Sequence, residues 1–488
     1  MQFPGSDFSA ILQRNKEDFA SIYDTLRWIT SAEADHAADE RAELLKQAHH
    51  RISWTHNETK PYYLNLSPGC RMCGSGAWSC LFVNGICNAE CFYCPTEQTS
   101  PDIPTTSSIQ FKHPRDYVDY LRVFDFKGVS ISGGEPFLTF DRTMQFISAI
   151  KRHFGDKIYL WLYTNGMLTS NDKLLQLGDA GVDEIRFNIG ATGYRLDHVR
   201  KAVNVINHVT VEIPAVPERY DLLKQKVREM EDTGVDFFNL HQIRCTPYNY
   251  KKLLDRNYTF LHGPAISILE SELTALKLLN YVIAENIKLP VNYCSLVYRN
   301  RFQTAGVRRR AALCIKRPYE DITAAGLIRS LSVRGNLKTI DRCAAHLRSR
   351  HDTDEMWHLD SSRERLYFNE EVSPLIDMDG LSLVVSYHVT TLRSFLTYRN
   401  LYREIYLNEK KKVVIERGPA CREIVLTGGD INRFCRQILC NDFTNNDSGG
   451  TFAVSGITEN SKRREVTPAE WETIIRSEYL QSGLAEYS

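Results

Sequence analysis

The sequence lacks the features that mark a secreted, membrane-bound or strongly charged protein. Its 488 residues include 60 basic and 60 acidic side chains, so no general attraction to nucleic acid or membranes is expected. The N-terminus, MQFPGSDFSAIL, has no basic-then-apolar signal pattern. The longest apolar stretches, such as Leu381–Tyr387, are far shorter than the ~20 residues of a membrane span. We therefore expect a cytoplasmic protein with no membrane partner.

Cysteine is the residue that this sequence has in excess. Hydrophobic residues make up 43% of the chain and charged residues 25%, which is ordinary for a globular protein. There are 13 cysteines, and disulfides are not expected in a reducing compartment. Six of them lie in the 25 residues from Cys70 to Cys94. Such clustering indicates metal binding.

Residues 61–290 alternate short β-rich runs with amphipathic stretches. We predict six strands, at Cys80–Ile86, Gly128–Ser132, Ile158–Tyr163, Asp183–Ile189, His208–Ile213 and Val235–Gln242. We predict helices near 113–123, 141–154, 171–179, 194–206, 219–233 and 270–285. This alternation predicts a parallel sheet with right-handed crossovers. The predicted fold class is α/β: a partial (βα)6 TIM-like barrel with N-terminal helices and a C-terminal α+β domain, binding ligands at the C-terminal strand ends.

Three further regions flank the predicted barrel. Residues 1–60 read as two helices, 8–29 and 33–50, that cover one barrel end. Residues 291–320 form a basic segment with an auxiliary cysteine, and residues 321–488 form the α+β domain. In that domain we predict strands at Leu381–Val389, Val413–Glu416 and Ile424–Leu426, and helices at 393–407, 429–439 and 468–480. Residues 441–463 are polar and rich in glycine and asparagine, which predicts a loop.

Cys87, Cys91 and Cys94 form a C-x3-C-x2-C loop after the first predicted strand, with Tyr93 before the last cysteine. Three thiolates in a short loop can face one point and leave one corner of a metal cluster open for substrate. Soft thiolate ligands suit both iron–sulfur clusters and zinc. The spacing by itself therefore leaves a zinc knuckle or a chance pattern as alternatives.

The second predicted strand ends in Gly133-Gly134-Glu135. Glycine permits close backbone approach, and a carboxylate accepts hydrogen bonds from an ammonium group. The cysteine loop followed one unit later by this motif resembles the radical S-adenosylmethionine (SAM) superfamily. The resemblance implies a [4Fe–4S] cluster on the three cysteines and SAM chelating the fourth iron. It also implies that Gly133, Gly134 and Glu135 hold the SAM amino group, and that Tyr93 belongs to the cofactor site.

The next two strands supply further candidate SAM contacts. Thr164-Asn165-Gly166 resembles a turn that lies near the SAM ribose and carboxylate in the family. Arg186 and Asn188 alternate along the fourth strand and therefore share one face. We predict that Arg186 pairs with the SAM carboxylate and Asn188 with a ribose hydroxyl. A polar network inside the barrel is the alternative for these two residues.

A second cysteine set precedes the loop. Cys70 and Cys73 form a C-x2-C-G knuckle, a pattern typical of metal sites. Cys294 is the first candidate for a further ligand, and the other candidates are Cys314, Cys245 and Cys80. The predicted group is a second [4Fe–4S] cluster, zinc or iron, with buried apolar cysteines as the alternative. The order of parts over residues 62–330 resembles a branch related to pyruvate formate-lyase activating enzymes, from which the extra knuckle departs.

The basic segment carries seven positive charges and no acid between residues 298 and 317. Arg301, Arg308 and Arg309 lie near one face of the predicted helix. Such a face suits RNA phosphates or an acidic peptide. A solvated helix is the alternative.

The resemblance implies the reaction but leaves the substrate open. A reduced cluster would pass one electron, from a flavodoxin- or ferredoxin-type donor, to SAM. Methionine and a 5′-deoxyadenosyl radical would form, and the radical would abstract hydrogen from a substrate. A peptide or protein substrate is our first expectation, with RNA or a small metabolite as the alternative. A non-catalytic iron–sulfur or zinc protein that has kept the fold is a different class of answer.

Overall fold

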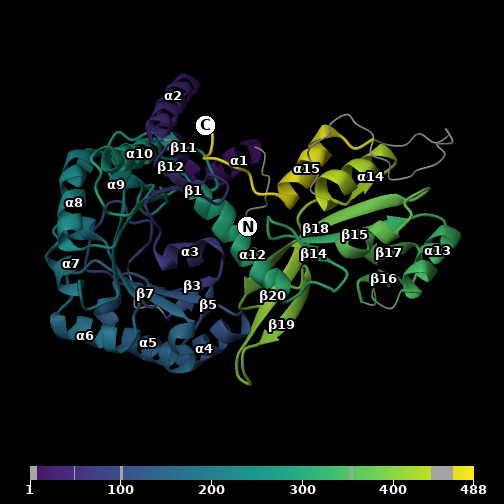
Figure 1. Cartoon of the computed structure of the whole chain (residues 1–488), viewed down its shortest axis with the longest axis horizontal. Coiled ribbons are helices and arrows are strands. Elements are labelled where there is room, and N and C mark those ends of the chain that lie inside the picture. Colours follow the sequence, from purple (N-terminus) through teal and green to yellow (C-terminus); the bar gives the residue numbers. More distant parts are fainter. Residues whose placement is uncertain are drawn as a thin grey trace.

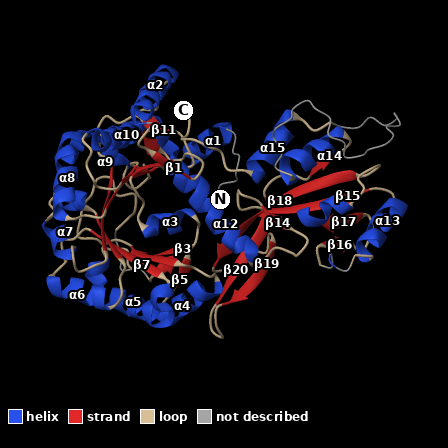
Figure 2. Cartoon of the chain, in the orientation of Figure 1, coloured by secondary structure: helices blue, strands red, loops and turns tan. Residues whose placement is uncertain are grey.

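The computed structural model describes residues 8–48, 50–98, 103–350, 352, 355–440 and 465–487. Two sheets organise the molecule, as Figures 1 and 2 show. A curved sheet with helices around its outside forms the larger part, and an antiparallel sheet with helices forms the smaller. Neither described part has a helix with the length and apolar character needed to cross a bilayer.

Seven parallel strands form the barrel wall, and adjacent members pair in sequence order. They are β3 (Trp78–Phe82), β6 (Gly128–Ser132), β7 (Tyr159–Thr164), β8 (Glu184–Phe187), β9 (His208–Pro214), β10 (Phe237–His241) and β13 (Val291–Cys294). Short antiparallel strands extend both edges: β2 (Lys60–Tyr63) and β1 (Ser53–Thr55) beyond β13, and β4 (Thr105–Thr106) and β5 (Ile109–Gln110) beyond β3. The sheet is open, which confirms the partial α/β barrel. β13 was missed because four residues show no periodicity.

Amphipathic helices cover the outside of this sheet. They are α4 (Pro114–Val123), α5 (Phe140–Phe154), α6 (Asn171–Asp179), α7 (Asp197–Ala202), α8 (Tyr220–Thr233) and α10 (Leu269–Ala284). Their apolar residues recur at helical spacing, as with Leu223, Val227 and Met230 of α8, which are all buried. Short 3-10 helices lie between strands and helices: η2 (Pro136–Thr139), η3 (Gly155–Lys157), η4 (Ile189–Thr192) and η5 (Pro217–Arg219). The six predicted strand–helix units are present, although α7 is shorter than predicted.

The helix α3 (Pro68–Gly74) lies inside the curve of the sheet (Figure 1). Ser67 caps it by accepting a hydrogen bond from Cys70 N, and Pro68 stands at its first turn, where a missing N–H costs nothing. The helix therefore carries the second cysteine set into the barrel interior.

The N-terminal segment packs near the cysteine loop. It comprises α1 (Phe8–Phe19), the 3-10 helix η1 (Ala20–Thr25) and α2 (Ser31–Ala48). The predicted single helix 8–29 is wrong, because the chain breaks at Ala20 with a φ of 45°. Phe19 and Tyr23 join a hydrophobic cluster with residues of α9 (Tyr250–Leu254), β11 (Phe260–Leu261) and β12 (Ser267–Ile268), against which Phe92 also packs.

The smaller sheet is antiparallel throughout. Its main order is β16 (Trp357–Leu359), β17 (Arg365–Phe368), β15 (Ile328–Arg334), β18 (Ser382–Arg393), β20 (Lys412–Pro419) and β19 (Leu401–Tyr406), with β14 (Asp321–Ile322) on β15 and β21 (Ile424–Leu426) on β18. Its helical elements are α13 (Leu337–Arg348), η8 (Glu370–Leu375), α14 (Gly429–Phe434), the π-helical turn η9 (Cys435–Leu439) and α15 (Pro468–Glu478). The predicted loop 441–463 lies outside the described residues.

The predicted helix 393–407 is wrong. β18 runs on to Arg393, and Leu401–Tyr406 forms the edge strand β19, paired along its whole length with β20. The strand lies at the edge of the sheet with mostly exposed side chains, and its pairing with β20 overrides the local helical pattern. Between the two sheets run α11 (Leu296–Tyr298), the π-helical turn η6 (Arg299–Gln303) and α12 (Thr304–Leu313).

Candidate functional site

The cysteine loop folds tightly over the end of the neighbouring strand β6. Gly134 N donates to Asn84 O at 3.1 Å, and Glu135 N donates to Ile86 O at 2.7 Å. A Cβ atom on Gly134 would lie 1.8 Å from Ile86 O, and one on Gly133, whose φ is +138°, would lie 2.4 Å from Asn84 O. Both positions therefore require glycine for contact with the cysteine loop itself, a reason that the sequence did not reveal.

The three thiols of this loop are half-buried and near one another. Ala89 N donates to Cys87 Sγ at 3.4 Å, and the Gln98 amide donates to Cys94 Sγ at 3.1 Å. Burial raises the pKa of Cys87 and of Cys91, and each also feels the charge of Cys94. Among the described residues, neither cysteine set already has three Cys, His, Asp or Glu side chains at metal-ligand distances. The donor set, three soft thiols on one loop, nevertheless fits an iron–sulfur cluster with an open corner.

Glu135 ties the ends of two strands together. Its carboxylate, only 1% exposed, accepts hydrogen bonds from Phe137 N (3.1 Å), Thr164 Oγ1 (2.9 Å) and Asn165 N (2.7 Å). Burial raises the pKa of Glu135, and these donors oppose that effect. The carboxylate therefore has an architectural role in this structure: it fixes the Thr164-Asn165 turn beside the cysteine loop.

The remaining predicted cofactor residues meet at the same place. Asn165 Nδ2 donates to Asn88 Oδ1 at 2.7 Å and approaches Cys87 Sγ at 3.8 Å. Tyr93 Oη donates to Asn188 Oδ1 at 2.9 Å. The cysteine loop is thus joined by hydrogen bonds to the C-terminal ends of β6, β7 and β8. Their role in binding SAM stays a prediction.

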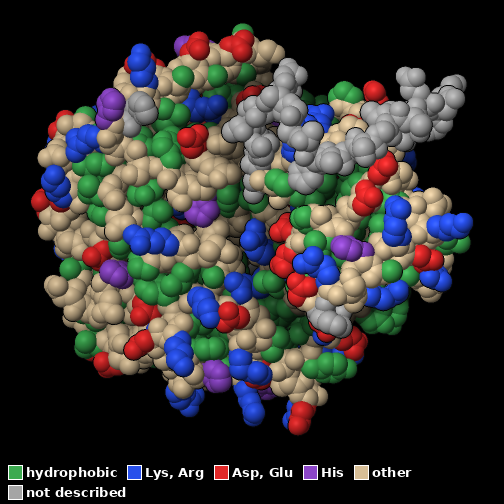
Figure 3. Space-filling view, turned by 45° about the vertical axis from the view of Figure 1, so that its right-hand side comes forward, with side chains coloured by type: hydrophobic (Ala, Val, Ile, Leu, Met, Phe, Trp, Pro, Cys, Tyr) green, Lys and Arg blue, Asp and Glu red, His purple; other side chains and the backbone are tan. Residues whose placement is uncertain are grey.

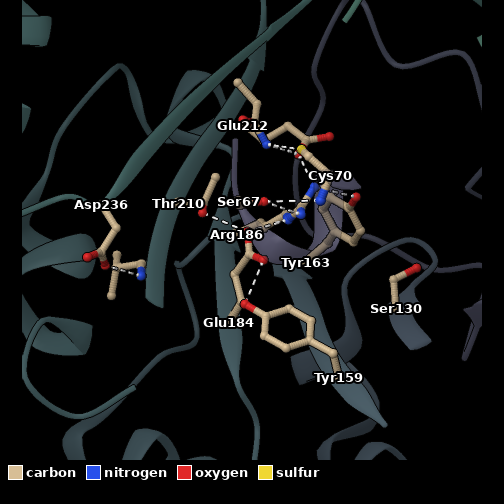
Figure 4. A network of polar contacts seen from close by, with 12 residues as sticks. Ser67, Cys70, Ser130, Tyr159, Tyr163, Glu184, Arg186, Thr210, Glu212 and Asp236 are labelled. Carbon is tan, nitrogen blue, oxygen red and sulfur yellow. Dashed lines mark hydrogen bonds and ion pairs between the residues drawn. The ribbon is translucent and has the colours of Figure 1, made fainter. Parts of the chain in front are cut away.

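Arg186 is buried in a polar network inside the barrel, which Figure 4 shows. It donates to Glu184 Oε1 at 2.8 Å, to Glu212 Oε2 at 2.7 Å and to Ser67 Oγ at 3.0 Å. Burial works against its charge, but Glu184 and other neighbours raise the pKa of Arg186. The same guanidinium opposes the effect of burial at Glu212 and keeps the pKa of that carboxyl below its usual value. Arg186 thus forms the interior polar network named as the alternative, and its contact with SAM stays a prediction.

The second cysteine set comes together in the barrel interior. Asn239 Nδ2 donates to Cys70 Sγ at 3.4 Å, and the Gln303 amide donates to Cys73 Sγ. Burial, together with the neighbouring Cys294 and Cys70, raises the pKa of Cys73 to about 12, against the lowering effect of Lys60. The structure therefore brings Cys70, Cys73 and Cys294 together around a residue that the sequence analysis missed, Lys60.

The three candidate fourth thiols differ in their surroundings. Cys80 is close to Ser130 and shares the charged neighbours Arg299 and Glu212 with Cys294. Cys245 belongs to the hydrophobic cluster that includes Phe19 and Tyr23, and Cys314 lies near Arg403 and Arg310. Which residue would complete the second set stays a prediction.

The arginines of the basic segment bind backbone carbonyl groups. Arg301 donates to Gln481 O at 3.1 Å and to Gly483 O at 3.0 Å, and the buried Arg308 donates to Ala325 O at 2.8 Å. Arg310 spans α12 and the barrel by donating to carbonyl oxygens of Gly76, Phe124 and Asp125. Figure 3 shows basic and acidic side chains interspersed over the face in view. These guanidinium groups therefore fasten segments of the protein to one another.

Parts of the chain are similar to known proteins. Residues 81–212 match the model of the Radical SAM superfamily. A Methanocaldococcus jannaschii protein, named as a candidate glycyl-radical enzyme activating enzyme, is 30% identical over 275 residues, which are 54% of this chain and 72% of that protein. Streptococcus suis SuiB bound to SAM gives a TM-score of 0.33 at 14% identity, over 59% of this chain and 61% of SuiB. The structure of anSMEcpe with SAM gives 0.28 at 14% identity, over 33% of this chain and 50% of that one.

The matched range includes the cysteine loop, the glycine pair and the other residues predicted to contact the cofactors. The family match begins in β3, immediately before the cysteine loop, and runs to Glu212 in β9. The similarity to the relative extends over 275 residues, more than the family model matches. Membership implies a [4Fe–4S] cluster and SAM as cofactors. The chain belongs to the radical SAM superfamily and is a radical SAM enzyme related to the activating enzymes.

Proposed function

We propose that this enzyme cleaves SAM reductively at a [4Fe–4S] cluster ligated by Cys87, Cys91 and Cys94. The resulting radical abstracts hydrogen from a peptide or protein substrate. The observation that carries the proposal is the close fit of the cysteine loop onto Gly133 and Gly134. That fit fixes three thiols beside the ends of β6, β7 and β8, where ligands bind in folds of this type. A reduced cluster with bound SAM supplies the radical chemistry.

The chain's own residues would bind and orient the two cofactors. The three cysteines would ligate iron. Tyr93 and Asn188, already joined at 2.9 Å, and Asn165, which approaches Cys87, line the same place and are proposed to contact SAM. Backbone groups of the glycine pair are proposed to meet the SAM amino group, since the Glu135 carboxylate is engaged with Thr164 and Asn165. Packing of the N-terminal helices beside Phe92 and Tyr93 would help to exclude water.

A protein substrate is favoured by the relative, whose name refers to activation of a glycyl-radical enzyme. RNA is less well supported, because Arg301, Arg308 and Arg310 already bind carbonyl oxygens within the chain. A small metabolite is the remaining alternative. We propose a flavodoxin- or ferredoxin-type electron donor, and an auxiliary metal group on Cys70, Cys73 and Cys294.

Product analysis tests the reaction. Anaerobically reconstituted, dithionite-reduced protein should convert SAM to 5′-deoxyadenosine and methionine. We call Cys87, Cys91 and Cys94 the triplet, and the cluster that they would bind the triplet cluster. Absence of 5′-deoxyadenosine from protein with a full triplet cluster would favour a non-catalytic binding protein. Deuterium transfer into 5′-deoxyadenosine from deuterated candidate peptides, compared with small metabolites, would identify the substrate class. Retention on RNA that falls steeply with salt would contradict the preference for a peptide.

A further inference from the structure

The second cysteine set lies around a buried cation. Lys60 is 1% exposed, and its Nζ lies 4.5 Å from the centroid of the Tyr298 ring. Burial opposes the charge of Lys60, but the neighbouring Cys294, Cys70 and Cys73 raise the pKa of this ammonium group. β2 pairs antiparallel with β13, Tyr62 lying opposite Asn292, so Lys60 and Cys294 belong to adjacent strands. Ser295 Oγ donates to Thr59 O at 2.7 Å and holds these two segments together.

A second buried donor faces the same place. Tyr298 is fully buried, and its hydroxyl has no hydrogen-bond partner in the described chain. A Cβ atom placed on Gly74, the residue after Cys73, would lie 2.9 Å from that hydroxyl. Burial raises the pKa of Tyr298, and the neighbouring thiols of Cys73, Cys294 and Cys70 add to that effect. Lys60 and Tyr298 therefore both lie beside all three thiols.

A buried donor without an acceptor, such as the Tyr298 hydroxyl, is uncommon in folded proteins and calls for an explanation. A single zinc ion on Cys70, Cys73 and Cys294 would bring no acceptor atoms of its own. An iron–sulfur cluster would bring inorganic sulfides, which accept hydrogen bonds, and a thiolate-ligated cluster carries negative charge that a buried ammonium balances. Asn239 and Gln303 already donate to the sulfurs of Cys70 and Cys73.

We infer that the auxiliary group is an iron–sulfur cluster rather than zinc, and that Lys60 and Tyr298 are the residues that position it and set its reduction potential. The inference rests on the auxiliary metal site proposed above and goes beyond it. Positive charge and hydrogen bonds at a cluster favour its reduced form, which carries one more negative charge. Removing either donor should therefore make the reduction potential of the auxiliary cluster more negative.

The first test isolates this site from the triplet. A variant with Cys87→Ala, Cys91→Ala and Cys94→Ala should, after anaerobic purification, retain roughly four irons and four sulfides per chain and no zinc. Zinc without sulfide would overturn the inference and leave the auxiliary metal site standing. Absence of any metal from this variant would contradict the auxiliary metal site. The proposed reaction would still be tested on its own, by SAM cleavage in the unmodified protein.

The second test measures the potential in that triplet-free background. Redox titration followed by electron paramagnetic resonance should give a more negative midpoint for Tyr298→Phe and a larger negative shift for Lys60→Met. Tyr398→Phe and Lys46→Met, at exposed positions, are the matched controls. Tyr298→Phe removes a single oxygen and keeps the packing, so the test does not depend on folding of the Lys60 variant. A midpoint for Tyr298→Phe equal to that of the control would overturn the assigned role.

Discussion

At the scale of single residues, we expect the loop cysteines to affect cofactor binding and the buried charges to affect stability. Cys91 lies in a loop held by backbone hydrogen bonds, such as that from Cys94 N to Cys91 O at 3.1 Å. Arg186 lies in the barrel interior between two carboxylates. Substitution of Cys91 should therefore affect cofactor binding, whereas substitution of Arg186 should affect the fold.

Cys91→Ala should abolish formation of 5′-deoxyadenosine while the chain stays folded. The half-buried thiol contributes little to packing, but loss of one ligand leaves the cluster incompletely held. The measurement pairs product analysis with a thermal unfolding curve. Cys421→Ala, a half-buried cysteine in the smaller part, is the control and should keep full activity. Full activity in Cys91→Ala would end the proposal.

Arg186→Met should lower the free energy of unfolding by about 3–5 kcal/mol, because it leaves Glu184 and Glu212 buried without their cation. Chemical denaturation of the metal-free protein measures this directly. The exposed pair of Arg363 with Asp341 offers the control, since Arg363→Met should cost about 0–1 kcal/mol. An unchanged stability, together with a weaker affinity for SAM, would instead support the predicted contact with the SAM carboxylate.

At the scale of elements, the joint between the cysteine loop and β6 organises the site. Two backbone hydrogen bonds and two glycines bring Asn84 and Ile86 against Gly133 and Gly134. Glu135 then links this joint to the next strand end through Thr164. The motif in the sequence thus determines the geometry of a loop 50 residues earlier in the chain.

Gly134→Ala should displace the cysteine loop, because the added Cβ would lie 1.8 Å from Ile86 O. We expect most of the triplet iron to be lost, and a destabilisation of about 1–3 kcal/mol, typical of overpacking. Iron content of the anaerobically prepared protein is the measurement. Gly429→Ala, where a Cβ meets no atom within 4 Å, should retain iron normally. A normal iron content in both variants would show that the close contact between Gly134 and Ile86 is not needed for cluster binding.

At the scale of the whole molecule, histidines in both parts limit stability in acid. Burial lowers the pKa of His262 to about 4, and Lys16 contributes; the ring stacks on Trp28 at 3.8 Å. Burial also lowers the pKa of His388 to about 4, and the adjacent Arg417 contributes. In the unfolded chain both rings take up protons below a pH of about 6.5, whereas the folded chain resists until about 4.

The free energy of unfolding should therefore fall as the pH drops from about 6.5 to 4, by up to about 3 kcal/mol per histidine before allowance for solvent screening. Denaturation curves of the triplet-free variant at several pH values measure this without interference from loss of the triplet cluster. His388→Asn should flatten the dependence, whereas substitution of the exposed His36 should leave it unchanged. A pH-independent stability would contradict the assignment of neutral buried rings.

The sequence by itself determined the barrel and the family, and it predicts where the first cluster binds. Strand–helix alternation predicted six units because apolar spacing is a local property, and the cysteine triplet and glycine pair are short motifs within single loops. The helix predicted at 393–407 failed because pairing with a distant strand made Leu401–Tyr406 an edge strand.

Only the tertiary structure decided what surrounds the second cysteine set. Cys294 was the first candidate ligand from the sequence, but no local pattern pointed to Lys60 or to Tyr298 as neighbours of these thiols. Arg186 likewise gained its carboxylate Glu212 from a neighbouring strand. Burial and charge pairing depend on contacts between distant segments, so they were settled only when β2, α3, β13 and α11 came together inside the barrel.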